Sequence, residues 1–157
     1  MRGWVRNGAS VFFFADTSAL VYLLVDHPGE PFAWVRELLQ DAPLAACDLF
    51  LPEAMAALRG RKDNRRLRPK DFVQATRALE ELASSLYLVE SSWPLMRAAA
   101  DLARRYPLRG ADAVHLAAAL AFSLKMPATF ITLDHRQYQV AKNLVPTHPI
   151  PDFEEEA

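Results

Sequence analysis

Short apolar runs of strand length alternate with longer stretches of helical periodicity through most of the chain. The run from Val11 to Ala15 is apolar at every position, and Ala128–Leu133 is a second such run near the other end. A strand that is continuously apolar is typical of a parallel sheet with both faces covered. The alternation therefore predicts an α/β domain with three α/β/α layers and a mostly parallel central sheet.

Further strands are predicted at Leu44–Cys47 and Leu86–Val89, and a short last strand at Leu144–Val145. The predicted helices cover Ser18–Val25, Pro31–Gln40, a segment from Pro52 through Leu58, a segment from Pro69 through Leu82, Trp93–Arg105, Ala111–Leu124 and Gln137–Lys142. The segment Ala111–Leu124 is so uniformly apolar that we expect it to be buried on all sides.

The chain of 157 residues has the usual length of one domain, with 52% apolar and 24% charged residues. This composition excludes a disordered protein and predicts a substantial core. We expect residues 1–10 to form a flexible leader, because they show no hydrophobic period. The folded domain is expected over residues 11–148, followed by an acidic tail over 149–157.

Two arginines, Arg2 and Arg6, precede an apolar run as in a secretory signal peptide. Asp16 interrupts that run, however, and no small-residue cleavage site follows it. No segment reaches the roughly 18 uninterrupted apolar residues of a membrane span. Cys47 is the single cysteine, which excludes an internal disulfide, and its apolar neighbours favour a buried, inert thiol. We therefore expect a cytoplasmic protein that makes no membrane contact.

Four acidic residues occupy positions where strands end or helices begin. Asp16 and Asp134 each follow a predicted strand directly, and the carboxyl ends of parallel strands meet at one edge of a sheet. Glu53 and Asp112 lie in the first turns of predicted helices. Each position alone is explained by capping of a helix, because an acid there complements the helix dipole. Four carboxylates beside an apolar helix, however, are costly to bury unless they are paired or bind a metal.

The oxygen donors of these acids suit a hard divalent cation such as Mg²⁺ or Mn²⁺. Zinc is disfavoured, because Cys47 stands alone and the four histidines form no ligand pair or HExxH motif.

The four acids belong to four ordered sequence motifs: Phe14–Leu20, Leu51–Glu53 with Ala57 and Leu58, Arg109–Ala117, and Ile131–Asp134. Together these motifs resemble those of the PIN-domain ribonucleases, and among them of the VapC toxins of bacterial and archaeal toxin–antitoxin pairs. The resemblance extends from about Val11 to Val145, nearly the whole domain.

The resemblance implies that the four acids hold the metal and are the catalytic residues of a metal-dependent endoribonuclease. Ser18 and Thr132 would then orient ligands or water, and either Asp112 or Asp134 could align the attacking water. One metal or two would serve. His115, in the third motif, has a structural as well as a functional interpretation. The resemblance further implies an RNA substrate, a small antitoxin partner and a homodimer.

A formal net charge of -1 provides no overall attraction to RNA, so a local basic patch is needed. The densest basic stretch runs from Arg59 to Lys70, soon after Glu53. We expect this stretch to lie near the rim of the acidic site, where Arg65 and Arg66 would bind RNA phosphates. Its other interpretation is a solvated helical hairpin. Arg109 is a further candidate for phosphate contact.

Other functions are open to a chain of this class. A phosphatase or phosphotransferase that uses Asp16 as a nucleophile typically has a second aspartate two residues later, where Ser18 stands. A nucleotide-binding Rossmann domain needs a glycine-rich loop after the first strand, and none follows Val11–Ala15. A catalytically silent module that binds RNA or a protein stays an alternative, although all four acids are present. A housekeeping RNA-processing nuclease is another.

Overall fold

The computed structural model describes residues 5–6, 9–25 and 32–151. Within these residues, a central sheet of four strands has the order β5-β4-β3-β6, and every pairing in it is parallel. The strands are β3 (Phe12–Ala15), β4 (Leu44–Cys47), β5 (Tyr87–Val89) and β6 (Ala128–Ile131). The predicted α/β fold with a mostly parallel sheet is confirmed.

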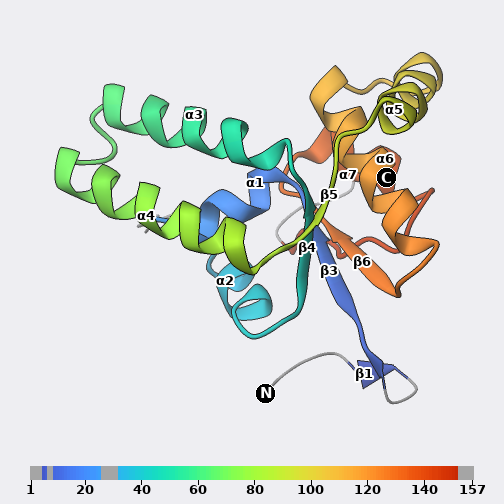
Figure 1. Cartoon of the computed structure of the whole chain (residues 1–157), viewed down its shortest axis with the longest axis horizontal. Coiled ribbons are helices and arrows are strands. Elements are labelled where there is room, and N and C mark those ends of the chain that lie inside the picture. The colour runs from blue at the N-terminus through green and yellow to red at the C-terminus, as the bar shows by residue number, and fades with distance from the viewer. Residues whose placement is uncertain (1–4, 7–8, 26–31, 152–157) are drawn as a thin grey trace.

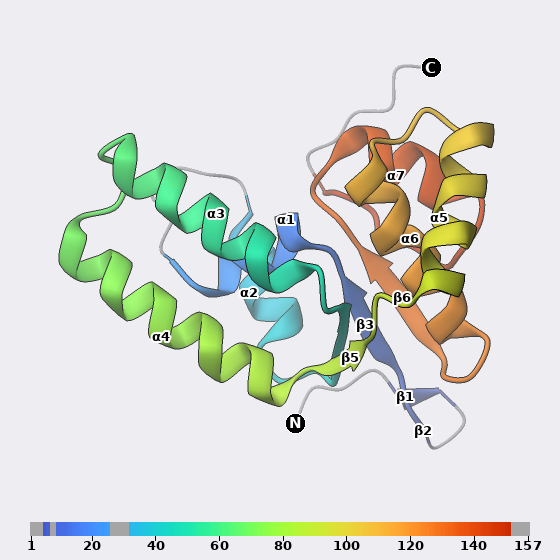
Figure 2. The same ribbon diagram turned by 45° about the horizontal axis from the view of Figure 1, so that its top comes forward.

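Helices cover both faces of this sheet (Figures 1 and 2). Figure 1 shows α1 to α4 on one side and α5 to α7 on the other. The helices are α1 (Thr17–Leu20), the 3₁₀ turn η1 (Val21–Leu23), α2 (Ala33–Leu39), α3 (Phe50–Asp63), α4 (Pro69–Ser85), α5 (Trp93–Arg105), α6 (Gly110–Ser123) and α7 (His135–Ala141). The three layers follow from this distribution.

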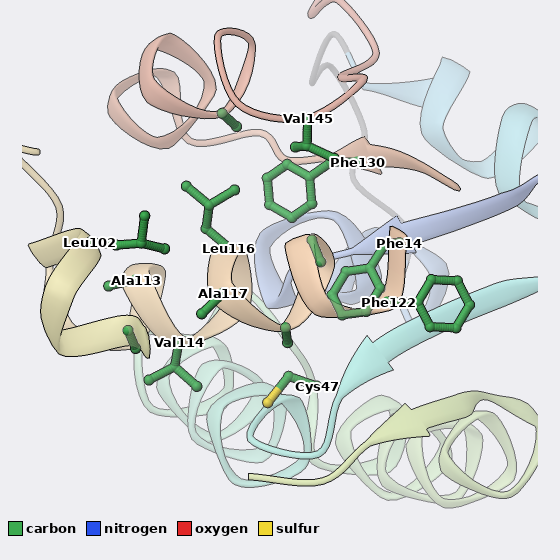
Figure 3. Close-up of a cluster of buried hydrophobic side chains, with 14 of the residues drawn as sticks. Phe14, Cys47, Leu102, Ala113, Val114, Leu116, Ala117, Phe122, Phe130 and Val145 are labelled. Carbon is green, nitrogen blue, oxygen red and sulfur yellow. The ribbon is translucent and has the colours of Figure 1, made fainter. Parts of the chain in front are cut away.

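Neighbouring side chains of a strand point to opposite faces, so each face of the sheet has its own core. On one face, Phe14 and Phe130 pack with Leu116 of α6. Figure 3 shows this core along α6. On the other face, Phe13 and Ile131 pack with α1, α3 and α4. Continuous apolar strands are therefore required, because both sets of side chains are buried.

The helix α6 lies within the first core, as its apolar sequence predicts. Residues 113–119 are all buried, whereas Ala121 is exposed. Cys47 is also buried in this core, and burial raises the pKa of its thiol to about 11. The prediction of a buried, inert thiol agrees with this position.

The order of the strands brings two chain segments together that are far apart in sequence. After β3 the chain adds β4 and β5 on one side, and β6 then pairs with the other side of β3. In the register of β3 and β6, Ala15 lies opposite Ile131, and the amide of Asp16 donates to the carbonyl of Ile131 at 3.1 Å. Ligands of open parallel sheets bind at such a reversal of strand order, beyond the carboxyl ends.

The helices α3 and α4 form a long hairpin that projects from the sheet (Figures 1 and 2). Glu53 lies in the first turn of α3, whereas Arg65 and Arg66 lie in the turn that follows its last residue, Asp63. The rise of an α-helix separates Glu53 from Asp63 by about 15 Å. The basic turn is thus at the far end of α3, and not at the rim of the acidic site as expected. Contact of this turn with RNA stays a prediction.

Two further predictions differ from the structure in detail. Ser18–Val25 is divided between α1 and η1. Leu144–Val145 is a turn, and the predicted last strand is reduced to one bridge between Thr147 and Phe130. Pro146 and Pro149 flank this bridge, and a proline has no N–H with which to extend a ladder.

Parts of the predicted leader and tail are also described. Val5–Arg6 (β1) pairs with Ala9–Ser10 (β2) in a short antiparallel ladder, so these residues of the leader form regular structure. The rest of the leader, and the acidic residues 154–156 of the tail, lie outside the described residues. No helix in the described part of the chain has the length and apolar character needed to cross a lipid bilayer.

Candidate metal and catalytic site

The four predicted acids come from four elements around the carboxyl ends of β3 and β6. Asp16 is the N-cap of α1 and Asp134 the N-cap of α7, each just beyond a strand. Glu53 and Asp112 lie in the first turns of α3 and α6. The electrostatic effects of Asp134, Asp16 and Glu53 all reach Asp112. The fold therefore gathers the four carboxylates into one region.

Asp16 is the most buried of these acids, with 3% of its surface exposed. Its Oδ1 accepts hydrogen bonds from Ser18 Oγ at 2.6 Å and from the amide of Ala19 at 3.2 Å. Its Oδ2 accepts from Thr132 Oγ1 at 2.6 Å. Burial raises the pKa of the Asp16 carboxyl, and these hydrogen bonds partly offset the effect. The carboxylate is thus held in a single orientation.

The hydroxyls of Ser18 and Thr132 also bind the backbone that leads to the last acid. Ser18 Oγ accepts from the amide of Leu133 at 2.9 Å, and Thr132 Oγ1 accepts from the amide of Asp134 at 3.1 Å. Each hydroxyl donates to Asp16 and accepts from a backbone amide just after β6. The two predicted hydroxyl residues therefore connect Asp16 to the segment that carries Asp134.

Gln137 connects the third and fourth acids, and it was not predicted as a site residue. Its backbone amide donates to Asp134 Oδ1 at 3.0 Å, and this hydrogen bond caps α7. Its fully buried side chain donates from Nε2 to the carbonyl of Asp112 at 2.9 Å. The position three residues after a capping aspartate explains the first bond, but nothing in the sequence indicates the second.

Glu53 is held by two residues, Thr17 and His115. Thr17 Oγ1 donates to Glu53 Oε1 at 2.9 Å, and His115 Nε2 contacts the same oxygen. The hydrogen bond with His115 is the main reason that the pKa of Glu53 is lowered. His115 is 2% exposed, and its Nδ1 has no hydrogen-bond partner among the described residues. A proton on Nε2 lets the imidazole donate to this carboxylate oxygen, which can only accept.

Thr17 is a second site residue that was not predicted. It lies between two residues that were, Asp16 and Ser18, and its hydroxyl is 3.3 Å from His115 Nε2. The only sequence signal is its place in the first motif. Its partners, Glu53 and His115, come from α3 and α6, so packing alone reveals its role.

The carboxyl group of Asp112 has a pKa well above its ordinary value. Burial is the main cause, the negative charges of Asp134 and Asp16 add to it, and His115 has the opposite effect; the resulting pKa is about 6. A carboxyl group near other carboxylates resists ionisation until a positive charge offsets the negative charge of its neighbours. The electrostatics of the site thus favour a bound cation.

The donor chemistry of these residues fits Mg²⁺ or Mn²⁺. The site offers carboxylate and hydroxyl oxygens, which are the ligands of hard cations. Both hydrogen bonds to Glu53 go to Oε1, so Oε2 is the oxygen that faces no donor among the described residues. Among the described residues, no three His, Cys, Asp or Glu side chains are already close enough together to hold one metal ion. Small side-chain movements, or water ligands, would complete the coordination.

The predicted RNA-binding arginines occupy two separate places. Arg109 is the N-cap of α6, three residues before Asp112, and its side chain is exposed. Arg65 and Arg66 are exposed in the turn between α3 and α4. Of these three arginines, only Arg109 is near a predicted metal ligand in the sequence, and it lines the same cleft as Asp134.

Comparison with known proteins places these features in a family. Residues 13–143 match the PIN domain, which confirms the resemblance seen in the four motifs. Over 108 residues the chain is 38% identical to ribonuclease VapC45 of Mycobacterium tuberculosis strain CDC 1551, covering 69% of this chain and 74% of that protein. Ribonuclease VapC49 of strain H37Rv matches with the same identity and coverage.

Solved structures show the same fold at lower identity. VapBC2 from Rickettsia felis, bound to a promoter DNA fragment, superposes with a TM-score of 0.59 at 16% identity, covering 88% of this chain and all of that one. PAE2754 from Pyrobaculum aerophilum has a TM-score of 0.59 at 22% identity, covering 87% of this chain and 89% of that one.

Proposed function

The chain belongs to the PIN-domain family, and we propose that it is a metal-dependent endoribonuclease that hydrolyses RNA phosphodiester bonds. The single observation that carries this proposal is the concentration of four carboxylates around the ends of β3 and β6, where burial and the neighbouring charges raise the pKa of Asp112 to about 6. A cluster of this kind is stabilised by a divalent cation. The two relatives named ribonuclease VapC support RNA as the substrate.

In this proposal the four acids would together hold Mg²⁺ or Mn²⁺. Asp16 and Glu53 are oriented ligands, because hydrogen bonds hold their carboxylates in place. Asp112 and Asp134 complete the ligand set, and one of them aligns the attacking water as a base. Ser18 and Thr132 keep Asp16 in orientation. A cation held by these residues would supply Lewis-acid activation of water and stabilisation of the leaving oxygen.

We also propose that the protein is the toxin of a toxin–antitoxin pair, with a small antitoxin as its partner. Solved structures of the same fold include VapBC2 and a toxin–antitoxin complex from Klebsiella pneumoniae, the latter with a TM-score of 0.58 at 17% identity. A homodimer and a cytoplasmic location are part of the same proposal. Size-exclusion chromatography with light scattering, on the protein alone and with the product of a neighbouring short gene, tests both kinds of assembly.

Substitution of single acids tests the nuclease. Asp16→Asn and Asp112→Asn each preserve shape but remove a charged ligand. We expect cleavage of single-stranded RNA in Mg²⁺ or Mn²⁺ to fall by at least about a hundredfold, since even outer partners of a metal site are worth 10–100-fold. The matched control is Asp63→Asn, which removes a charge in an exposed ion pair at the far end of α3. This control should cleave normally.

Two results would contradict the proposal. Cleavage that survives both substitutions would show that these acids are not part of the active site. A purified protein that binds RNA in both metals without cutting it would instead be a silent binding module. Circular dichroism of each variant confirms that loss of cleavage is not loss of the fold.

A further inference from the structure

A cleft with a volume of about 500 Å³ opens beside Asp134, and the proposed reaction does not account for it. Its lining is formed by Phe32, Arg109, Leu133, Asp134, His135 and Arg136. Asp134 belongs both to this cleft and to the four acids. A ligand in the cleft would therefore lie next to the place where the metal is proposed to bind.

The two arginines of the cleft come from the starts of the helices that carry two of the acids. Arg109 precedes Asp112 at the start of α6, and Arg136 follows Asp134 in the first turn of α7. Both side chains are exposed, and neither forms an ion pair with another described residue. Two guanidinium groups without acidic partners are a suitable site for an anion, which they bind through charge-assisted hydrogen bonds.

The cleft also contains an aromatic wall. Phe32 is partly buried, and its ring packs edge-on against Tyr22 with centroids 5.1 Å apart. Aromatic rings that line a basic groove are the usual stacking surface for bases of single-stranded nucleic acid. The lining of the cleft thus suits a nucleotide: the two arginines can bind its phosphate, and the phenylalanine ring can stack on its base.

We propose that this cleft binds the nucleotide next to the scissile bond of a single-stranded RNA. Arg109 and Arg136 bind its phosphate, and its base stacks on Phe32. The proposal rests on the proposed ribonuclease function and specifies how the substrate is held. It also resolves an electrostatic difficulty, because a site with four carboxylates repels a polyanion and needs positive charge beside it.

RNA binding can be measured without cleavage in an Asp16→Asn background. The probe is a fluorescein-labelled single-stranded oligoribonucleotide. Its fluorescence anisotropy gives the Kd at a series of salt concentrations from about 50 mM to 200 mM. R109A/R136A should weaken binding at low salt by roughly tenfold for each lost contact. The slope of log affinity against log salt should flatten by about 1.4, or about 0.7 for each phosphate contact.

Phe32→Leu separates stacking from charge. Leucine keeps the apolar packing but removes the aromatic face, so affinity should fall by about tenfold while the salt slope is unchanged. The matched control for charge is R77A/R97A, which removes two exposed arginines from α4 and α5. This control should leave both affinity and slope nearly unchanged.

The proposal is overturned if R109A/R136A leaves the salt slope unchanged, or if R77A/R97A flattens it equally. An unchanged slope would assign the two arginines to an acidic protein partner instead of RNA. Thermal melts of each variant exclude unfolding as the cause. Because the measurement requires no cleavage, a failure of the proposed nuclease activity would be seen separately, in the protein with all four acids intact.

Discussion

At the scale of single residues, the two carboxylate oxygens of Glu53 have different environments. Thr17 and His115 both contact Oε1, and no described residue donates to Oε2. A carboxylate with one oxygen held by donors loses little further freedom when the other oxygen binds a cation. In the proposed metal site, Thr17 would therefore act on the cation through Glu53, as a positioning residue.

Substitution of Thr17 should weaken metal binding without unfolding the protein. Thr17→Val has the same shape but lacks the hydroxyl, so we expect the affinity for Mn²⁺ to fall by about tenfold. Thr17→Ser retains the hydroxyl and should restore most of that affinity. Isothermal titration calorimetry with Mn²⁺ gives both values. Equal affinities for the valine and serine variants would show that the hydroxyl has no such role.

Asp112 makes the stability of the metal-free protein depend on pH. Its pKa is raised from 3.8 to about 6 in the folded state, so the folded protein binds more protons than the unfolded chain between these values. Stability must then fall as pH rises through this window. Because Asp112 is only half-buried, solvent screening reduces the effect to the order of 1 kcal/mol at neutral pH.

Asp112→Asn should remove this pH dependence. In chelator at pH 7, the variant should be more stable than the unmodified protein by the order of 1 kcal/mol, whereas at pH 4 the two should differ little. Urea unfolding at the two pH values gives the comparison. A variant that is less stable than the unmodified protein at pH 7 would mean that Asp112 is well accommodated as an anion.

At the scale of elements, α3 connects the acidic site to a basic turn at its other end. Within the hairpin, several charges are already paired: Arg59 with Asp63, Arg68 with Asp71, and Lys62 over the ring of Phe72. The turn itself closes at Arg65, which has a positive φ of 59°. Part of the basic stretch is thus committed to holding the hairpin together, and exposed Arg65 and Arg66 are the better candidates for RNA.

R65A/R66A tests whether the hairpin contacts the substrate. Alanine and arginine are about equally strained at the positive φ of position 65. The substitution therefore removes charge and leaves the backbone conformation of the turn nearly unchanged. If both arginines bind phosphate, the salt slope of RNA binding flattens by about 1.4, and Mn²⁺ affinity is unchanged. An unchanged slope would leave the segment as a solvated hairpin. Comparing short and long RNA in this variant shows whether the turn contacts the strand far from the site of cleavage.

At the scale of the whole molecule, metal binding at the four carboxylates would be coupled to folding. The unfolded chain does not hold these acids together, so a cation binds the folded state selectively. At a hundredfold excess over its dissociation constant, Mn²⁺ should stabilise the protein by about 2.7 kcal/mol. For a chain of this size, the Tm should rise by roughly 5–10 °C.

Thermal melts in Mn²⁺, Mg²⁺ and chelator measure this coupling. The unmodified protein should melt at a higher temperature in either metal than in chelator. Asp112→Asn is the control and should show a much smaller difference. Identical melting curves in metal and chelator for the unmodified protein would count against a metal site at these four acids.

Local patterns in the sequence determined the fold class and the positions of the acids. Buried parallel strands need apolar side chains on both faces, so the runs around Phe13 and Phe130 could be recognised without the structure. The helix Trp93–Arg105 has the predicted bounds, because Ser92 caps it and Pro94 suits its first turn. Acids that follow strands directly, such as Asp16 and Asp134, are visible for the same local reason.

Only the tertiary structure decided which side chains meet. Thr132 reaches Asp16 because β6 pairs with β3, and His115 reaches Glu53 because α3 and α6 begin at the same edge of the sheet. The cleft beside Asp134 likewise depends on Phe32, which lies far from it in sequence. Hydrophobic periodicity specifies which face of an element is buried, but strand order and helix packing bring residues 62 and 116 positions apart into contact. Those contacts orient the acids, and no local pattern encodes them.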